Sequence, residues 1–279
     1  VMAGYRNRVE RPVRISVQRH RYGEGKQLLL TRDVTMLEQA EAMRRDFVAN
    51  VSHEIRTPLT VMSGFIETLQ TLPLDASERE KYLDLMALQA TRMQELVNDL
   101  LILSQLEGSS LPSTNEPVAV DGFMSSIESE ARGLSSAQMQ EGDEPQILHF
   151  DQPSYLKILG ASKELHSAVS NIVNNAVRYT PAGGLITALW TVLPDQRLQF
   201  SVVDTGPGIA SEHIPRLTER FYRVDRSRSR ESGGTGLGLA IVKHVMQRHG
   251  GELRIESELG KGSRFSLIFP ASRVVIEEV

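Results

Sequence analysis

The sequence has no cysteine, no excess of basic residues and no long apolar run. Without cysteine, disulfide bonds, thiolate zinc sites and cysteine nucleophiles are excluded, so any metal must be held by oxygen or imidazole ligands. The formal net charge of −4 argues against direct nucleic-acid binding, which favours a basic face. The densest apolar run, residues 96–103, is broken by Asn98 and Asp99. It is far shorter than the ~18 residues that a membrane-spanning helix needs.

The rest of the composition is that of a globular protein, with 40% hydrophobic and 24% charged residues. A length of 279 residues is enough for two domains, or for one domain and an extended module. The chain starts at Val1 in strand-like sequence and has no signal-like segment, so we expect a soluble fragment of a longer protein.

Residues 1–35 are expected to belong to a sheet. Residues 13–17 alternate in polarity, and residues 27–31 follow a glycine-containing turn, which together predict a β-hairpin. Because an isolated hairpin is only marginally stable, it is expected to be part of a larger domain. The string at residues 33–35 resembles the exit of a PAS sensor domain, and an unrelated hairpin is the alternative.

Residues 36–107 are predicted to form a hairpin of two long helices. Apolar residues recur at spacings of three and four over residues 36–71 and again over about 77–106. Pro58 predicts a kink in the first helix, because proline removes one backbone hydrogen bond. The long apolar stripe cannot be buried within one hairpin, so we predict a homodimer with a four-helix bundle. Packing of the hairpin on the chain's own C-terminal domain is the alternative.

Residues 108–117 are rich in glycine, serine and proline and are predicted to be a linker. They lead to a second domain at 118–272, with a tail at 273–279. Its mixture of strands and helices predicts an α+β sandwich with helices on one face of a mixed sheet. The expected elements are a strand entering a helix at 118–133, strands at 146–150, 186–191, 198–203, 253–257 and 263–269, and helices at 162–179 and 238–249.

His53, in the first long helix, is the candidate nucleophile. A neutral imidazole has a free lone pair that can attack phosphorus, and the carboxylate of Glu54 can hold the other ring N–H. Thr57 lies four residues on, on the same side of the helix, where its hydroxyl can position a water. An ordinary, partly exposed helical histidine is the alternative.

Two asparagines on the 162–179 helix are candidate metal ligands. Asn171 and Asn175 are spaced i,i+4, and Arg178 is expected on the same face. Amide oxygens suit a Mg²⁺ ion that keeps waters and substrate phosphates in its other positions. By spacing alone, two ordinary surface asparagines are the alternative.

Two glycine-containing loops complete the pattern. Asp204 ends a strand before Gly206 and Gly208, where its carboxylate can accept a hydrogen bond from an adenine amino group. The glycines let the backbone approach the base. Residues 234–238 precede a helix and free backbone N–H groups to face phosphates. This loop is not a Walker sequence, because no lysine follows it.

Together these strings resemble those of two-component sensor histidine kinases over residues 47–269. Residues 47–59 are similar to the family's phosphoacceptor motif, His-Glu-x-x-Thr/Asn-Pro. The later strings resemble the Bergerat-type, or GHKL, ATP site that the family shares with gyrase-type ATPases and Hsp90-type chaperones. The nucleotide-binding residues that the resemblance implies are Asn171, Asn175, Arg178, Tyr179, Asp204, Gly206, Gly208, Arg223, Gly234, Thr235, Gly236, Leu237 and Gly238.

The resemblance implies ATP and Mg²⁺ as cofactors, with Asn175 as the principal metal ligand, Asn171 beside it and Asp204 reading adenine. Arg178 stands where the family most often has lysine, which leaves its phosphate contact open. Phe221 is expected to pin an ATP lid, of which residues 226–232 are mobile surface.

The resemblance also implies an ATP-dependent protein-histidine kinase. His53 would accept the γ-phosphate with Glu54 as general base and pass it to an aspartate of a response regulator, and Thr57 would support dephosphorylation of that regulator. The intact protein is expected in a bacterial inner membrane, with this fragment in the cytoplasm. A serine kinase or ATPase with the same nucleotide fold, or a non-catalytic dimeric scaffold, is the alternative.

Overall fold

A computed structural model describes residues 13–22, 26–140, 142–224 and 234–277. The expected lid surface at 226–232 lies outside these residues. The chain divides into two compact units, residues 1–70 and 71–279, and each is described by itself. Among the described helices, none has both the length and the apolar character needed to cross a membrane.

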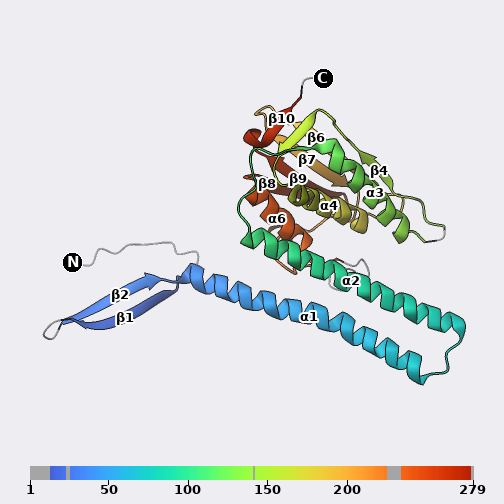
Figure 1. Cartoon of the computed structure of the whole chain (residues 1–279), viewed down its shortest axis with the longest axis horizontal. Coiled ribbons are helices and arrows are strands. Elements are labelled where there is room, and N and C mark those ends of the chain that lie inside the picture. Colours follow the sequence, from blue (N-terminus) through green and yellow to red (C-terminus); the bar gives the residue numbers. More distant parts are fainter. Residues whose placement is uncertain (1–12, 23–25, 141, 225–233, 278–279) are drawn as a thin grey trace. The chain divides into compact units, whose positions relative to one another are not determined.

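The first unit contains a β-hairpin and one long helix (Figure 1). Strands β1 (Ile15–Tyr22) and β2 (Lys26–Asp33) are antiparallel, which confirms the predicted hairpin. Helix α1 (Thr35–Thr71) follows, and it runs through Pro58 without interruption, so the predicted kink does not break the helix. Proline removes one hydrogen bond, and the remaining bonds of this helix of 37 residues keep it continuous.

The second unit begins with α2 (Ala76–Gly108). Its first turn is closed by a capping box, in which Asp75 accepts the Glu78 N–H at 2.8 Å and Glu78 accepts the Asp75 N–H at 3.0 Å. The pair satisfies two backbone donors that would otherwise be left free at the helix start. Leu96, Leu103 and Leu106 are buried, and α2 contacts α6 (Gly238–Arg248). The alternative, packing on the chain's own C-terminal domain, therefore holds for part of α2.

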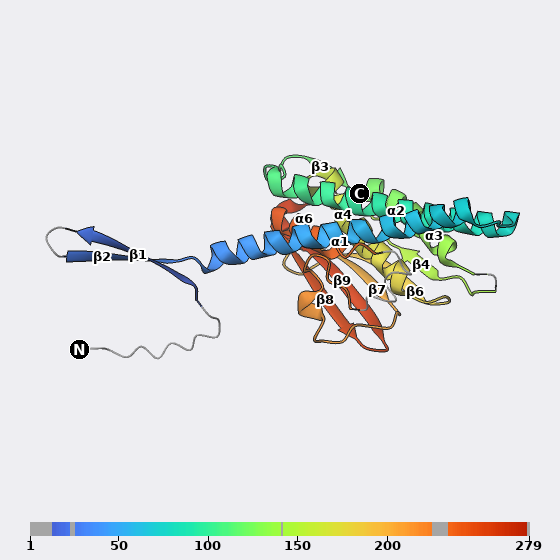
Figure 2. The same ribbon diagram turned by 90° about the horizontal axis from the view of Figure 1, so that it is seen from below.

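A mixed five-stranded sheet forms the centre of the C-terminal domain, in the order β4-β6-β7-β9-β8. β4 and β6 are parallel and the other neighbours are antiparallel. The strands are β4 (Ile147–Phe150), β6 (Leu185–Val192), β7 (Leu198–Asp204), β8 (Glu252–Glu258) and β9 (Gly262–Phe269). Helices α3 (Val120–Gln138), α4 (Ser162–Tyr179) and α6 cover one face of this sheet, as predicted (Figure 2).

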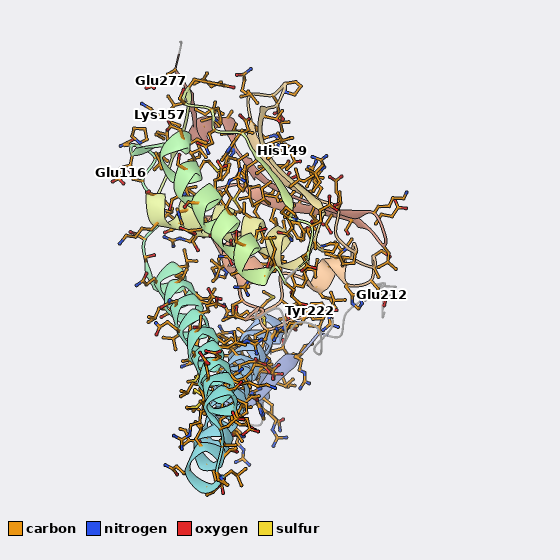
Figure 3. All side chains as sticks on the ribbon, turned by 90° about the vertical axis from the view of Figure 1, so that its right-hand side faces the viewer. Glu116, His149, Lys157, Glu212, Tyr222 and Glu277 are labelled. Atoms are coloured by element: carbon orange, nitrogen blue, oxygen red, sulfur yellow. The ribbon has the colours of Figure 1, made fainter. Side chains whose placement is uncertain are left out.

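A second sheet was not predicted. β5 (Leu156–Leu159) lies between β3 (Pro117–Ala119) and β10 (Val274–Ile276), and β10 falls within the predicted tail. Buried Arg273 donates to the carbonyls of Ser113 at 2.8 Å and Leu159 at 2.9 Å. Lys157 and Glu277 form an ion pair at the same end of the domain (Figure 3). Residues 273–277 are therefore part of the domain, and the predicted tail was wrong there.

Candidate active site

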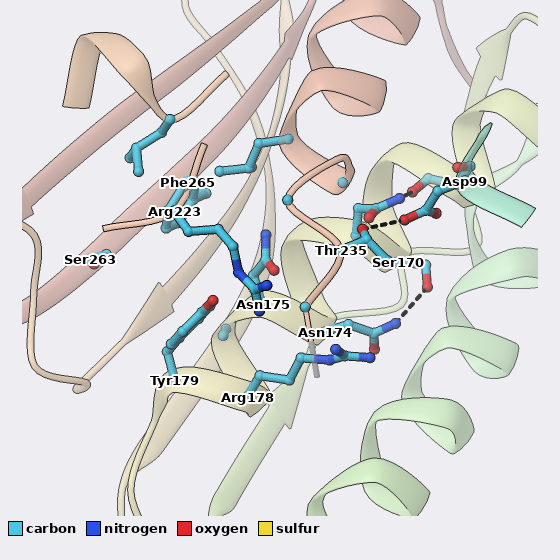
Figure 4. Close-up of a pocket in the computed structure, with 18 of the residues that line it drawn as sticks. Asp99, Ser170, Asn174, Asn175, Arg178, Tyr179, Arg223, Thr235, Ser263 and Phe265 are labelled. Carbon is cyan, nitrogen blue, oxygen red and sulfur yellow. Dashed lines mark hydrogen bonds between the residues drawn. The ribbon is translucent and has the colours of Figure 1, made fainter. Parts of the chain in front are cut away.

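A cavity of about 1060 Å³ lies within the second unit (Figure 4). Its wall comes from α4, the end of β7, the loop before α6 and one side of α2. The predicted nucleotide-binding residues that line it are Asn171, Asn175, Arg178, Tyr179, Asp204, Gly208, Arg223, Gly234, Thr235, Gly236 and Gly238. Residues that lie far apart in the sequence are therefore brought together around one space large enough for a nucleotide.

Two predicted residues do not line the cavity. The Gly206 N–H donates to Asp204 Oδ1 at 2.9 Å, so Gly206 orients the carboxylate. The Leu237 side chain is fully buried in the core. Leucine belongs there because the turn before α6 packs its apolar side chain inward while the neighbouring glycines face the cavity.

Asp204 is the last residue of β7 and a buried carboxyl group in the cavity wall. Burial raises its pKa, because the charged form loses solvation, and hydrogen bonds from the Gly206 and Ser263 N–H groups partly oppose this. An acceptor held in place and shielded from water suits a single amino donor such as that of adenine. The position of Asp204 follows from the sheet, because β7 ends at the edge where its two antiparallel neighbours, β6 and β9, begin.

Helix α4 presents the asparagine face to the cavity. Asn171 donates from Nδ2 to the Ser167 carbonyl at 2.8 Å, and this leaves its Oδ1 towards Gly238 at the start of α6. A Cβ atom on Gly238 would lie 2.3 Å from that oxygen, so any larger residue there would displace the Asn171 amide. Asn175 also faces the cavity (Figure 4).

The asparagine donor set fits a magnesium ion that shares its coordination with phosphates. The described residues contain no group of three or more histidine, aspartate and glutamate side chains that could form an all-protein cage. Mg²⁺ keeps waters and substrate phosphates, so one or two protein oxygens suffice. Asn175, with Asn171 beside it, can supply them.

The glycine loop is joined to the segment that contains Phe221. Gly236 has φ +73°, and a Cβ atom there would lie 2.9 Å from the Phe221 Cα. The Phe221 N–H donates to the Gly236 carbonyl at 2.8 Å, and Phe221 itself has φ +62°. Two backbone segments thus approach closely beside the cavity, which requires a residue without a side chain.

Sequence reasoning missed the contribution of α2 to this cavity. Thr235 Oγ1 donates to Asp99 Oδ2 at 2.5 Å, and Arg178 Nη2 donates to Glu95 at 3.1 and 3.3 Å. Burial raises the pKa of Asp99, although the Thr235 bond lowers it. One signal was present, because Asn98 and Asp99 interrupt the densest apolar run of the chain.

The candidate phosphoacceptor lies in the first unit. His53, Glu54 and Thr57 are exposed on α1, and the Thr57 hydroxyl donates to the His53 carbonyl at 3.2 Å. An exposed imidazole is accessible to a reaction partner. Glu54, the proposed holder of the ring N–H, is the next residue along the helix and is exposed as well.

Two family profiles match these regions. Residues 43–109 match the His Kinase A (phospho-acceptor) domain, and residues 160–273 match the family described as Histidine kinase-, DNA gyrase B-, and HSP90-like ATPase. The chain belongs to the sensor histidine kinases. Its helical region and its GHKL-type ATPase domain follow the order of that family.

The relatives of this sensor histidine kinase include the phosphate regulon sensor protein PhoR. The Pseudomonas aeruginosa protein is 48% identical over 258 residues, which are 92% of this chain and 57% of that protein. PhoR of Haemophilus influenzae is 36% identical over 94% of this chain and 59% of its own length. SenX3 of Mycobacterium tuberculosis is 37% identical over 88% and 58%. The chain therefore spans less than two thirds of the length of these relatives.

Solved structures show the same fold. Full-length ShkA in complex with AMPPNP is similar with a TM-score of 0.56 and 28% identity, over 84% of this chain and 47% of that one. The Acinetobacter baumannii histidine kinase AdeS gives a TM-score of 0.58 over 78% of this chain and 98% of that one. At 21% identity the AdeS likeness concerns the fold alone.

Proposed function

We propose that this chain is the kinase part of a two-component sensor, which phosphorylates His53 from Mg·ATP and passes the phosphoryl group to an aspartate of a response regulator. One observation carries the proposal. The cavity gathers Asn175, Asp204 and the glycine loop, while a separate exposed helix carries His53. The ShkA relative, described in complex with AMPPNP, supports ATP as the nucleotide.

Each of the cavity residues has a role in nucleotide binding that follows from its chemistry. Asp204 accepts the adenine amino group, and Asn175 with Asn171 holds Mg²⁺. Arg178 and Arg223 contact phosphate oxygens, and Tyr179 lines the cavity beside Asp204. Backbone N–H groups of the loop at the start of α6 face the phosphates, where the helix dipole favours negative charge.

In the transfer step, a ring nitrogen of His53 forms a bond to the γ-phosphorus as the bond from this atom to the β–γ bridging oxygen breaks. ADP leaves with that oxygen, and Glu54 takes the ring proton as general base. Mg²⁺ neutralises charge on the phosphates when it is bound. The remaining catalysis comes from positioning and from the cationic side chains.

We also propose the domain organisation. Residues 36–107 are the dimerisation and phosphotransfer hairpin, 108–117 a linker and 118–277 the catalytic domain, after a PAS-like segment at 1–35. Apolar side chains exposed along α1, among them Leu37, Val48, Leu59 and Ile66, support burial against a second copy in a four-helix bundle.

The 48% identity to PhoR supports a phosphate-starvation signal and a PhoB-like response regulator as partner. Thr57 orients a water that dephosphorylates this regulator. The intact protein is anchored in the bacterial inner membrane, and the present segment faces the cytoplasm.

Incubation with γ-labelled ATP tests the proposal. Wild type is expected to take up label that acid removes and base does not, and to transfer it to the PhoB-like regulator. His53→Gln and Asn175→Ala are both expected to abolish labelling, the first by removing the acceptor and the second by removing the metal ligand. Acid-stable label on serine, or label retained by His53→Gln, refutes the proposal.

A further inference from the structure

One side of α2 forms part of the wall of the nucleotide cavity. Four residues of this helix line it: Glu95, Asn98, Asp99 and Ile102. Glu95 and Asp99 are spaced i,i+4, so both carboxylates project from the same side of the helix. Each carboxylate reaches a different part of the ATP-binding domain, Arg178 on α4 and Thr235 in the glycine loop.

These two partners belong to the parts of the cavity that the proposed function assigns to phosphate. Arg178 is the cation on the asparagine face, and Thr235 lies in the loop at the start of α6. A carboxylate and a phosphate offer the same kind of anionic oxygen to guanidinium and hydroxyl donors. The contacts are also partly shielded, because only 16% of the Arg178 side chain is exposed and the Glu95 and Asp99 side chains are half-buried.

The far end of α2 is held by contacts outside the predicted nucleotide residues. Arg248 on α6 donates to the Leu106 carbonyl at 2.9 Å, and Glu107 forms an ion pair with Arg220. Leu103 is buried beside them. These contacts hold the end of the helix independently of the bonds that Glu95 and Asp99 make.

We propose that Glu95 and Asp99 stand in for the triphosphate in the nucleotide-free protein, so that α2 and ATP compete for Arg178 and Thr235. Binding of a triphosphate then expels this stretch of α2 from the cavity. The conformation of α2, the helix that follows the phosphoacceptor helix in the chain, thus depends on whether a nucleotide is bound. This inference rests on the proposed function, because it requires a nucleotide in the same cavity.

The first test measures affinity for adenosine, Mg·ADP and Mg·AMPPNP on the whole chain. Asp99→Asn and Glu95→Gln keep side-chain size but remove the charge. Each is expected to tighten Mg·AMPPNP binding about tenfold, because a like charge is removed from a partly shielded site. Adenosine affinity is expected to stay within about twofold, because the base lies at Asp204. Asp84→Asn removes the same charge from an exposed part of α2 and serves as the control.

The second test separates competition from general electrostatics. The chain has no cysteine, so Ala87→Cys on α2 and Gln247→Cys on α6 give two unique exposed labelling sites. The distribution of spin-label distances between them is expected to move to longer values or to broaden when Mg·AMPPNP is added to the doubly labelled chain with Glu95 and Asp99 intact. Asp99→Asn with Glu95→Gln is expected to show that distribution without nucleotide.

The inference is overturned if Mg·AMPPNP binding is unchanged or weaker in both charge variants. It is also overturned if the spin-label distances do not change when the nucleotide is added. Weaker binding in particular would mean that the carboxylates help to hold the metal. If wild type binds no nucleotide at all, the proposed function itself fails. If wild type binds the nucleotide and phosphorylates His53, but the charge variants have the same nucleotide affinity as wild type, only the proposed competition fails.

Discussion

Replacing Arg248 by alanine is expected to destabilise the C-terminal domain strongly, because this guanidinium joins four segments. It donates to both carboxylate oxygens of Glu164 at 3.0 Å, and to the carbonyls of Leu106, Ser109 and Ser110 at 2.9, 3.0 and 2.5 Å. Only 9% of its side chain and 17% of that of Glu164 are exposed.

The magnitude follows from this burial. Removing one partner of a buried ion pair leaves the other charge uncompensated and costs about 3–5 kcal/mol. For a domain of this size each 1 kcal/mol lowers Tm by about 2–4 °C, so a loss on the order of 10 °C is expected. Arg254→Ala is the control. Its pair with Glu252 is more than half exposed on both sides, and such pairs contribute at most about 1 kcal/mol.

Unfolding in urea, followed by tryptophan fluorescence, is the suitable assay. Trp190 is the single tryptophan of the chain, and its ring centroid lies 4.6 Å from that of Phe200 in the core. Its fluorescence therefore reports the unfolding of this domain alone. The midpoint of Arg248→Ala is expected far below those of wild type and Arg254→Ala. If the midpoints of the two alanine variants coincide, the reasoning about the buried pair is wrong.

Two further predictions concern the core and the glycine loop. Burial lowers the pKa of His249, so below the unfolded value of about 6.5 the unfolded chain binds more protons, and the stability of wild type falls as the pH drops through that value. Urea midpoints at pH 5.5 and 7.5 should differ less in His249→Gln, and an equal pH dependence in both proteins would refute this. Gly236→Ala forces φ +73° and a clash with the Phe221 backbone, costing about 1–3 kcal/mol locally, and should weaken Mg·AMPPNP binding measured by calorimetry. Gly260→Ala, at φ +82° with open space around it, should leave the affinity unchanged, and equal losses in both variants would contradict the local argument.

The sequence by itself determined the long, strongly patterned elements. The predicted helix at 162–179 has the observed bounds, because its apolar residues recur with the period of a helix and face the core as one stripe. The strand ending at Asp204 and the glycine loop before α6 were found the same way, since each joins a regular element to residues of distinctive chemistry. Local pattern and local structure agree there.

Only the tertiary structure decided the small sheet and the α2 wall of the cavity. β5 and β10 contain four and three residues, too few for a period to be recognised, and β10 is held by pairing with a strand far away in the sequence. The sequence does not reveal the partners of Glu95 and Asp99, because these lie 83 and 136 residues further along. A contact between distant segments depends on how the whole domain packs, and no local pattern of residues encodes it.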